Sequence, residues 1–228
     1  MIFYGVGLGP GDPELVTPKA LRILAEADAV FVPESGRESV AGGILAHHSV
    51  RDVIPLTFPM IRDEARRNAA IRRELDRVRP LWERAATLAM PVIGDAALYA
   101  TAAYLYDVLR EEVPDIELEL VPGVSAHSLA SCRARRFLAL GPESLAVASG
   151  TAPLSSVREL LRNADAAVIY KPTALGEGLR EVVIATGPWA TVLRVDRAGL
   201  ADEKITEGNA ALEPSGEYLG VVQLLRRR

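Results

Sequence analysis

Short apolar runs along the chain alternate with segments whose apolar residues recur at helical spacing. The run from Ile2 to Val6 breaks at glycine and proline, whereas Thr17 followed by Pro18 is typical of a helix start. We predict strands near residues 2–6, 29–32, 91–93, 116–120, 144–148, 166–170, 191–195 and 218–225, and helices near 18–27, 62–79, 98–109, 125–133, 155–163 and 177–185. This alternation predicts an α/β fold.

A break in the pattern near the middle of the chain suggests two domains. Pro122-Gly123 ends the strand predicted near 116–120, and a similar series of strands and helices follows without a long linker. We therefore expect two packed α/β domains, residues 1–121 and 122–228, with a ligand cleft between them.

Composition narrows the class of protein. The chain has 228 residues, 49% of them hydrophobic and 25% charged, which fits an ordinary soluble domain. The net charge of −4 argues against a nucleic-acid or anionic-membrane partner, and no apolar run is long enough to span a bilayer. Cys132 is the single cysteine, which leaves no disulfide framework and no cysteine-based metal site. We therefore expect a cytoplasmic protein without a metal. Cys132 itself is expected to be a small buried residue. Arg226 to Arg228 suggest a solvated chain end.

Three loops that follow predicted strands contain the candidate chemistry: Gly7-Leu8-Gly9-Pro10-Gly11-Asp12, Gly94-Asp95 and Pro122-Gly123-Val124-Ser125. Glycine lets a ligand approach the backbone, and ligands of α/β sheets bind beyond the carboxyl ends of strands. The first loop fails as a dinucleotide fingerprint because Pro10 or Asp12 stands where the third glycine belongs. A P-loop is excluded because no Gly-Lys-Ser/Thr follows.

In order and spacing, these loops resemble the three signatures of the tetrapyrrole methylases. The first match runs from Val6 to Thr17, and the third is Val121-Pro122-Gly123-Val124-Ser125. The segments 59–63, 143–147 and 197–199, together with Trp82, resemble the precorrin-2 C20-methyltransferase branch. Two features depart from the pattern: Ala96 replaces a proline, and the segment between Trp82 and Val92 is short.

The resemblance implies a homodimeric enzyme that binds S-adenosyl-L-methionine in the cleft and methylates C20 of precorrin-2 or cobalt-precorrin-2 in cobalamin biosynthesis. Residues at matching positions are the expected cofactor contacts: Pro10, Ile93, Gly94, Asp95, Leu98, Ser125, Ala126, Lys171 and Ala198. Asp95 also fits the N-cap of a helix that starts at Ala97, and Ser125 has the same ambiguity.

Methyl transfer to carbon requires loss of a proton, which a general base can accept. Asp12 is the first candidate and Tyr99 the second, although Asp12 also suits a turn. The substrate's carboxylates call for basic side chains. We consider Arg37, Arg62 and the cluster at 133–136, of which Arg133 or Arg136 is expected to dominate. His47 and His48 suit a loop better than a metal site.

Two other functions remain open. The scaffold also fits methylation of another tetrapyrrole carbon or of a translation factor. A protein that binds cofactor or tetrapyrrole without turnover is the third hypothesis, which Ala96 and the short central segment suggest.

Overall fold

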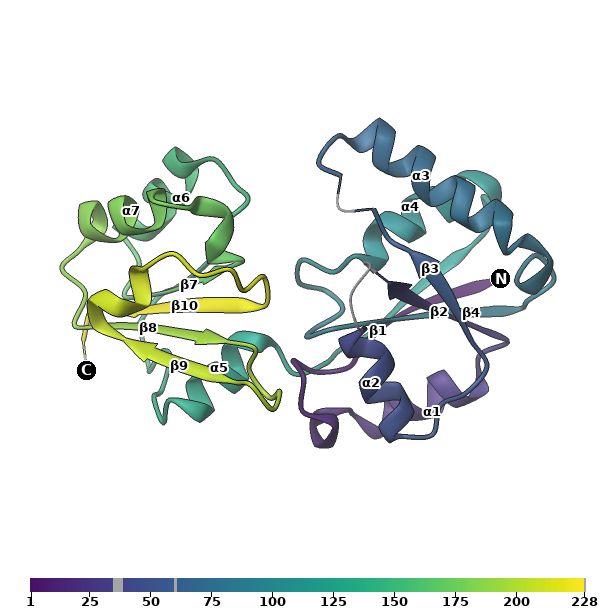
Figure 1. The fold of residues 1–228 in the computed structure, drawn as a ribbon, viewed down its shortest axis with the longest axis horizontal. Helices are drawn as coiled ribbons and strands as arrows, with labels where there is room; N and C mark the ends of the chain where they lie inside the picture. The colour runs from purple at the N-terminus through teal and green to yellow at the C-terminus, as the bar shows by residue number, and fades with distance from the viewer. Residues whose placement is uncertain (35–38, 60, 228) are drawn as a thin grey trace. The chain divides into compact units, whose positions relative to one another are not determined.

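The computed structural model describes residues 1–34, 39–59 and 61–227, which form two compact units, Met1–Ser125 and Ala126–Arg228 (Figure 1). Each unit has its own five-stranded sheet and its own helices, which confirms the predicted α/β class. The domain bounds 1–121 and 122–228 and the cleft between the domains stay predictions, because a compact unit need not be an independently folding domain.

The sheet of the first unit is entirely parallel, in the order β3-β2-β4-β1-β5. All its strands therefore end at the same edge. The strands are β1 (Ile2–Gly7), β2 (Ala29–Glu34), β3 (Val53–Thr57), β4 (Thr87–Val92) and β5 (Glu117–Val121).

Two helices cover each face of this sheet, as Figure 1 shows. Alternation along β2 supplies both cores: Phe31 packs on the α3 and α4 side, and Val30 on the α1 and α2 side. Thr17 starts α1 as predicted, since its hydroxyl oxygen accepts the N–H of Ala20 at 3.2 Å. The helices are α1 (Pro18–Glu26), α2 (Val40–His47), α3 (Glu64–Arg77) and α4 (Ala102–Glu112).

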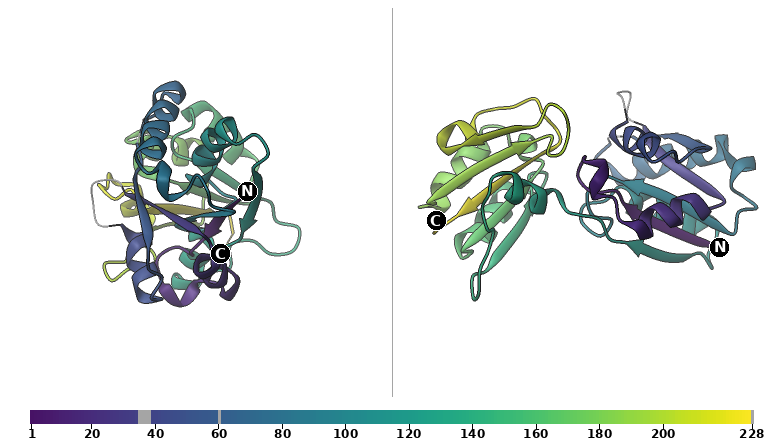
Figure 2. Two further views of the ribbon diagram at one scale, coloured as in Figure 1. Left: turned by 90° about the vertical axis from the view of Figure 1, so that its right-hand side faces the viewer. Right: turned by 90° about the horizontal axis from the view of Figure 1, so that it is seen from below.

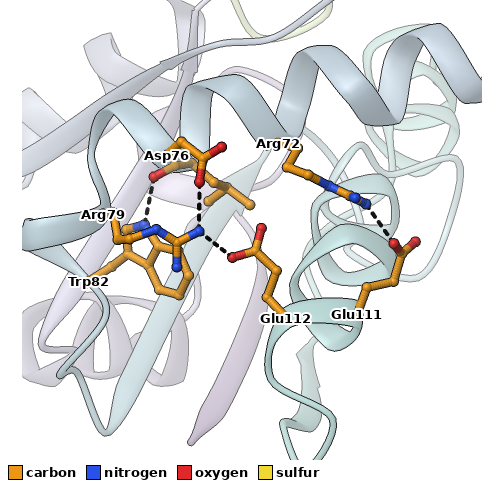
Figure 3. A network of polar contacts seen from close by, with 7 residues as sticks. Arg72, Asp76, Arg79, Trp82, Glu111 and Glu112 are labelled. Carbon is orange, nitrogen blue, oxygen red and sulfur yellow. Dashed lines mark hydrogen bonds and ion pairs between the residues drawn. The ribbon is translucent and has the colours of Figure 1, made fainter.

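Ion pairs join α4 to α3 and to Arg79, which lies just after the end of α3 (Figure 3). Arg72 pairs with Glu111 at 2.5 Å, and Arg79 pairs with Glu112 at 2.6 Å. Arg79 lies over the ring of Trp82, which is buried as expected for a core residue and donates its indole N–H to the Leu75 carbonyl. Exposed pairs of this kind contribute little stability each, so the apolar core does most to hold α3 in place.

The second unit has a mixed sheet in the order β6-β7-β10-β8-β9. β6 and β7 are parallel, and β10 is antiparallel to both β7 and β8, so β6, β7 and β8 all end at one edge. The strands are β6 (Leu145–Ser149), β7 (Ala166–Tyr170), β8 (Thr191–Asp196), β9 (Lys204–Glu207) and β10 (Gly220–Leu225).

One face of the second sheet packs on α6 (Leu154–Arg162) and α7 (Gly178–Thr186), and the other on α5 (Ala126–Arg133). The view from below in Figure 2 places α5 in front of this sheet, and α1 and α2 in front of the first. Short 3₁₀ helices complete the chain: η1 (Pro13–Leu15), η2 (Arg79–Leu81), η3 (Pro172–Leu175) and η4 (Gly208–Leu212).

Two expectations about single residues are wrong. Cys132 is exposed, because α5 turns Leu129, Ala130 and Ser131 toward the sheet and leaves the next position outside. Arg226 is not a solvated chain end, since its guanidinium donates to carbonyls at the ends of α6 and α7. In the part of the chain that the structure describes, every helix is too short or too polar to cross a membrane.

Candidate functional site

The three glycine loops leave the first sheet side by side, because they follow the neighbouring strands β4, β1 and β5. The loop after β1 leads to α1 on one face of the sheet, and the loop after β4 leads to α4 on the other. The two connections therefore diverge at this edge. Such a topological switch point is where open α/β sheets bind ligands.

The first and second loops are joined by their backbones. The N–H of Gly94 donates to the Gly9 carbonyl at 2.8 Å, and the N–H of Gly9 donates to the Gly94 carbonyl at 3.2 Å. This reciprocal pair is an antiparallel bridge beyond the ends of the parallel strands β1 and β4. The two loops consequently form one rigid piece of backbone.

The third loop packs against this pair at Gly123. A Cβ atom on Gly7 would lie 2.6 Å from the Gly123 nitrogen, so a side chain there has no room. The Asp95 carboxylate binds the same point, because its Oδ2 accepts the Gly123 N–H at 3.1 Å while its Oδ1 accepts the Ala97 N–H at 2.8 Å. One carboxylate thus connects the second loop to the third.

These contacts correct one interpretation of Asp95. It does not cap a helix at Ala97, because α4 begins only at Ala102 and Asp95 instead closes a turn of its own loop. The turn uses the N–H of Ala97 and not that of Ala96. Replacement of the family's proline by Ala96 therefore leaves this hydrogen bond intact.

Gly94 is a buried residue of the joined loops that has empty space where a side chain would lie. Its φ is +84°, and a Cβ built on it would meet no atom within 4 Å. A ligand can approach this backbone closely, as a cofactor held by main-chain groups requires. Near it, Pro10 is buried in the first loop, and Ile93 and Leu98 are half-buried in the second. These residues fit a cofactor site at the switch point.

Asp12 and Tyr99 lie in the first and second loops, and each has a defined geometry. The Oδ1 of Asp12 accepts the N–H of Glu14 at 3.0 Å and caps η1, so the predicted turn role exists. Tyr99 is 43% exposed, its φ of +53° is unusual for a bulky residue, and burial raises the pKa of its phenol. Tyr99 also lines an apolar groove of about 310 Å³ between α4 and β5.

Lys171 and Ala198 lie together at the edge of the second sheet where β7 and β8 end. The N–H of Lys171 donates to the Gly220 carbonyl at 3.2 Å, and that of Arg197 donates to the Leu219 carbonyl at 2.7 Å, so both loops flank the start of β10. Lys171 has φ +53°, and Ala198 is buried. Ser125 comes directly before α5, in the N-cap position, and Ala126 is the first residue of that helix.

Comparisons with known proteins agree with this arrangement. The model of the tetrapyrrole (corrin/porphyrin) methylases matches residues 3–213. The chain belongs to this family. The resemblance seen in the three loops is thereby confirmed.

This methylase is 32% identical to a probable cobalt-precorrin-2 C(20)-methyltransferase of Methanocaldococcus jannaschii, over 90% of the chain and 86% of that protein. It is 31% identical to the cobalamin biosynthesis protein CobIJ of Mycobacterium tuberculosis over 97% of the chain, but it spans only 45% of that protein's length. Its fold matches uroporphyrin-III C-methyltransferase of Thermus thermophilus complexed with S-adenosylhomocysteine, with a TM-score of 0.71, 20% identity, and coverage of 98% of this chain and 96% of that one.

The arginines proposed for substrate binding are not related by helical spacing. α5 ends at Arg133, because Arg135 takes a left-handed conformation and the N–H of Arg136 closes the helix end on the Ser131 carbonyl. Arg136 is exposed beyond the helix, whereas Arg133 pairs with Glu203 at 3.3 Å. Arg62 is exposed on the first unit, and Arg37 lies outside the described residues.

The adjacent histidines are structural in this methylase. His47 ends α2, and the Nε2 of His48 contacts the Pro13 carbonyl at 2.8 Å, which ties that helix to the first loop. Among residues 1–34, 39–59 and 61–227, histidine, cysteine and carboxylate side chains form no cluster suited to a metal ion.

Sequence reasoning missed a polar group in the second unit that contains His127, Tyr170 and Gln223. The available signal was Gln223, a lone amide within the apolar strand from Gly220 to Leu225. A buried polar residue in such a strand needs partners, and these partners lie on α5.

Proposed function

We propose that this chain is an S-adenosylmethionine-dependent methyltransferase that methylates C20 of precorrin-2 or cobalt-precorrin-2 in cobalamin biosynthesis. The observation that carries the proposal is the set of three interlocked glycine loops at the switch point, with open space beside Gly94. The name of the M. jannaschii relative supports C20 as the target carbon. The ligand of the T. thermophilus structure supports the cofactor.

The cofactor is held largely by backbone groups. Gly94 offers close approach, and Pro10, Ile93 and Leu98 supply apolar contact around it. Asp95 fixes the second loop against the third by its two hydrogen bonds and so keeps these groups in place. Ser125, Ala126, Lys171 and Ala198 complete the proposed set.

In this reaction the protein mainly aligns the methyl donor with C20 and accepts a proton. A bound sulfonium supplies an activated methyl group, so no nucleophilic side chain is needed. A tyrosine phenol is protonated at neutral pH, and burial raises the pKa of Tyr99 further, which suits a hydrogen-bond donor better than a base. Asp12, held by the Glu14 N–H, is therefore the first candidate to accept the proton from C20.

The decisive experiment incubates the protein with S-adenosylmethionine and either metal-free precorrin-2 or its cobalt form. Mass spectrometry and NMR locate the new methyl group, and we expect it on C20. Methylation of another tetrapyrrole carbon or of a translation factor would favour a different enzyme of the same scaffold. Binding of cofactor and ring without turnover would favour the carrier hypothesis.

Two substitutions assign the proton acceptor. If Asp12 is the base, Asp12→Asn should lower the methylation rate about 10²-fold or more, while Tyr99→Phe should lower it much less. Single-turnover assays at saturating substrate measure both rates. The reverse order would assign the role to Tyr99.

The substrate's carboxylates are proposed to meet Arg133 or Arg136. Loss of one charge-assisted hydrogen bond should raise the dissociation constant of the ring on the order of tenfold, while the affinity for S-adenosylhomocysteine stays nearly unchanged. Arg→Gln variants at both positions, titrated with each ligand, make the comparison. Two variants that bind the ring like wild type would remove both arginines from the site.

The resemblance also supports a homodimer, and the charge and composition support a cytoplasmic protein without nucleic-acid or membrane partners. Light scattering of the purified protein tests the homodimer, and a monomer at all concentrations would contradict it.

A further inference from the structure

A hydrogen bond joins the start of α5 to the end of β7. The Nδ1 of His127 lies 2.7 Å from the hydroxyl oxygen of Tyr170, and the same hydroxyl accepts the backbone N–H of His127 at 3.5 Å. The two rings meet edge to face, with centroids 5.9 Å apart. His127 is the second residue of α5, where a backbone N–H has no partner within its own helix. Tyr170 thus binds both the side chain and the backbone at the start of the helix.

Gln223 supports His127 from the sheet below. Its Nε2 donates to the His127 carbonyl at 2.8 Å and to the Ser131 hydroxyl at 3.0 Å, and the Ser131 hydroxyl contacts its Oε1 at 3.3 Å. Only 2% of Gln223 is exposed, so an unsatisfied amide here would be costly. The neighbours Val222 and Leu224 pack toward α6 and α7, which directs Gln223 to α5. The amide therefore fixes α5 over one point of β10.

The positions of these residues in the chain connect them to the proposed cofactor contacts. His127 directly follows Ala126, and Tyr170 directly precedes Lys171. Lys171 has a left-handed backbone conformation, and its N–H donates to the Gly220 carbonyl. The position of the Lys171 Cα atom therefore depends on where β7 ends. The hydrogen bond between His127 and Tyr170 thus directly joins the residues next to Ala126 and Lys171.

We propose that His127 and Tyr170 are positioning residues of the cofactor site, which hold Ala126 and Lys171 at the spacing that the cofactor requires. The inference rests on the proposed function, because it assumes that these two neighbours contact S-adenosylmethionine. Neither His127 nor Tyr170 needs to touch the cofactor. Their contribution is to preorganise the site before the ligand arrives.

The test removes the hydrogen bond and measures cofactor affinity and fold stability separately. Tyr170→Phe deletes one hydroxyl and keeps the ring, and His127→Leu deletes the imidazole. Each should raise the dissociation constant for S-adenosylhomocysteine about 3- to 10-fold, which is the worth of one hydrogen bond. His127→Asn places a polar atom near the former Nδ1 and should restore most of the affinity. Calorimetric titration gives the constants, and thermal unfolding without ligand gives the stability.

Tyr106→Phe is the matched control, because Tyr106 bonds the Ile116 carbonyl in the first unit, away from His127 and Tyr170 in sequence and in contacts. It should leave the dissociation constant unchanged. Wild-type affinity in Tyr170→Phe and His127→Leu, with only the unfolding temperature lowered, would make the pair merely structural and overturn the inference alone. Failure of the wild-type protein to bind S-adenosylhomocysteine would overturn both this inference and the proposed function.

Discussion

At the residue scale, Gly94 differs from the other loop glycines Gly7 and Gly123 in what a side chain would meet. A side chain at Gly7 or Gly123 would collide with the backbone of another loop, so these glycines serve the packing of the loops. Gly94 has no such neighbour, yet its φ of +84° and its bonds to Gly9 hold it firmly. A rigid, open backbone position beside a switch point is what a cofactor held by main-chain groups needs.

Gly94→Val should therefore abolish or sharply weaken S-adenosylhomocysteine binding. The new side chain enters the space assigned to the cofactor, and we expect the dissociation constant to rise on the order of tenfold or more. Positive φ also strains any β-branched residue, so strain must be separated from obstruction. Gly141→Val is the control for strain, because Gly141 lies in a different loop, has φ +55° and also leaves a Cβ without an atom within 4 Å. Calorimetric titration of both variants makes the comparison, and equal affinities would remove Gly94 from the site.

The sequence was sufficient to find the residues of the three loops but not the bonds between them. Glycine at a strand end predicts a turn that a ligand can approach. Whether Gly9 pairs with Gly94, or Asp95 reaches Gly123, depends on which strands are neighbours. That information lies in contacts distant along the chain. The helix end at Arg133 was predicted, but the left-handed conformation of Arg135 was not, because a left-handed arginine has no compositional signal.

At the element scale, the missed elements are those with weak apolar patterns. α2 contains Gly42 and Gly43, which lower helix propensity, and β3 has Pro55 on an edge where no ladder bond is lost. β9 has one apolar residue, Ile205. The predicted β4 was too short, because we took Pro91 as its first residue. Proline is tolerated inside this strand because β2 pairs with β4 only as far as Ala89, so no strand lies where the N–H of residue 91 would point.

Arg226 shows how one side chain can hold two elements. Its Nε donates to the Ala164 carbonyl at 2.7 Å, its terminal nitrogens reach carbonyls at the ends of α6 and α7, and the guanidinium lies 4.2 Å from the centroid of the Trp189 ring. A positive charge at helix carboxyl ends is also favoured by the helix dipoles. Arg226 is thus part of the fold.

We expect Arg226→Ala to destabilise the second unit by about 2–3 kcal/mol, since several charge-assisted bonds disappear together. Arg227→Ala removes the same charge from an exposed neighbour and should have little effect. Urea unfolding followed by tryptophan fluorescence measures both, and Trp189 reports on the second unit. Equal stability of the two variants would show that the bonds of Arg226 contribute nothing.

At the scale of the whole molecule, the alternation of strands and helices predicted the α/β class but neither strand order. The first sheet places β4 between β2 and β1, and the second inserts the last strand, β10, between β7 and β8. Apolar periodicity reports which residues are buried and not which strand lies beside which. The switch point that positions the site exists only because of this order.

Each unit has an aspartate just before a strand that accepts hydrogen bonds from a neighbouring serine or threonine, and these aspartates make the stability of both units depend on pH. Before β2, Asp28 accepts the backbone N–H and the hydroxyl of Thr87. Before β7, Asp165 accepts the backbone N–H and the hydroxyl of Ser144. These bonds hold the pKa of both carboxyls below the ordinary value of 3.8. A carboxylate whose pKa is lower in the folded state stabilises the fold above the unfolded pKa, and the benefit is lost as pH falls through the folded pKa.

Asp28→Asn and Asp165→Asn should therefore lower the unfolding temperature at neutral pH, because one oxygen, Oδ2, accepts both bonds in each aspartate and a neutral amide oxygen accepts more weakly than a charged carboxylate. The difference from wild type should stay constant above about pH 5 and shrink as pH falls through the ordinary carboxyl pKa of 3.8 and below, because protonation removes the advantage of the native carboxylate. Asp115→Asn, at an exposed turn, is the control. Differential scanning calorimetry across this range measures the differences. Since the two aspartates lie in different units, each variant should move the transition of its own unit, and a difference that stays constant with pH would contradict the assignment.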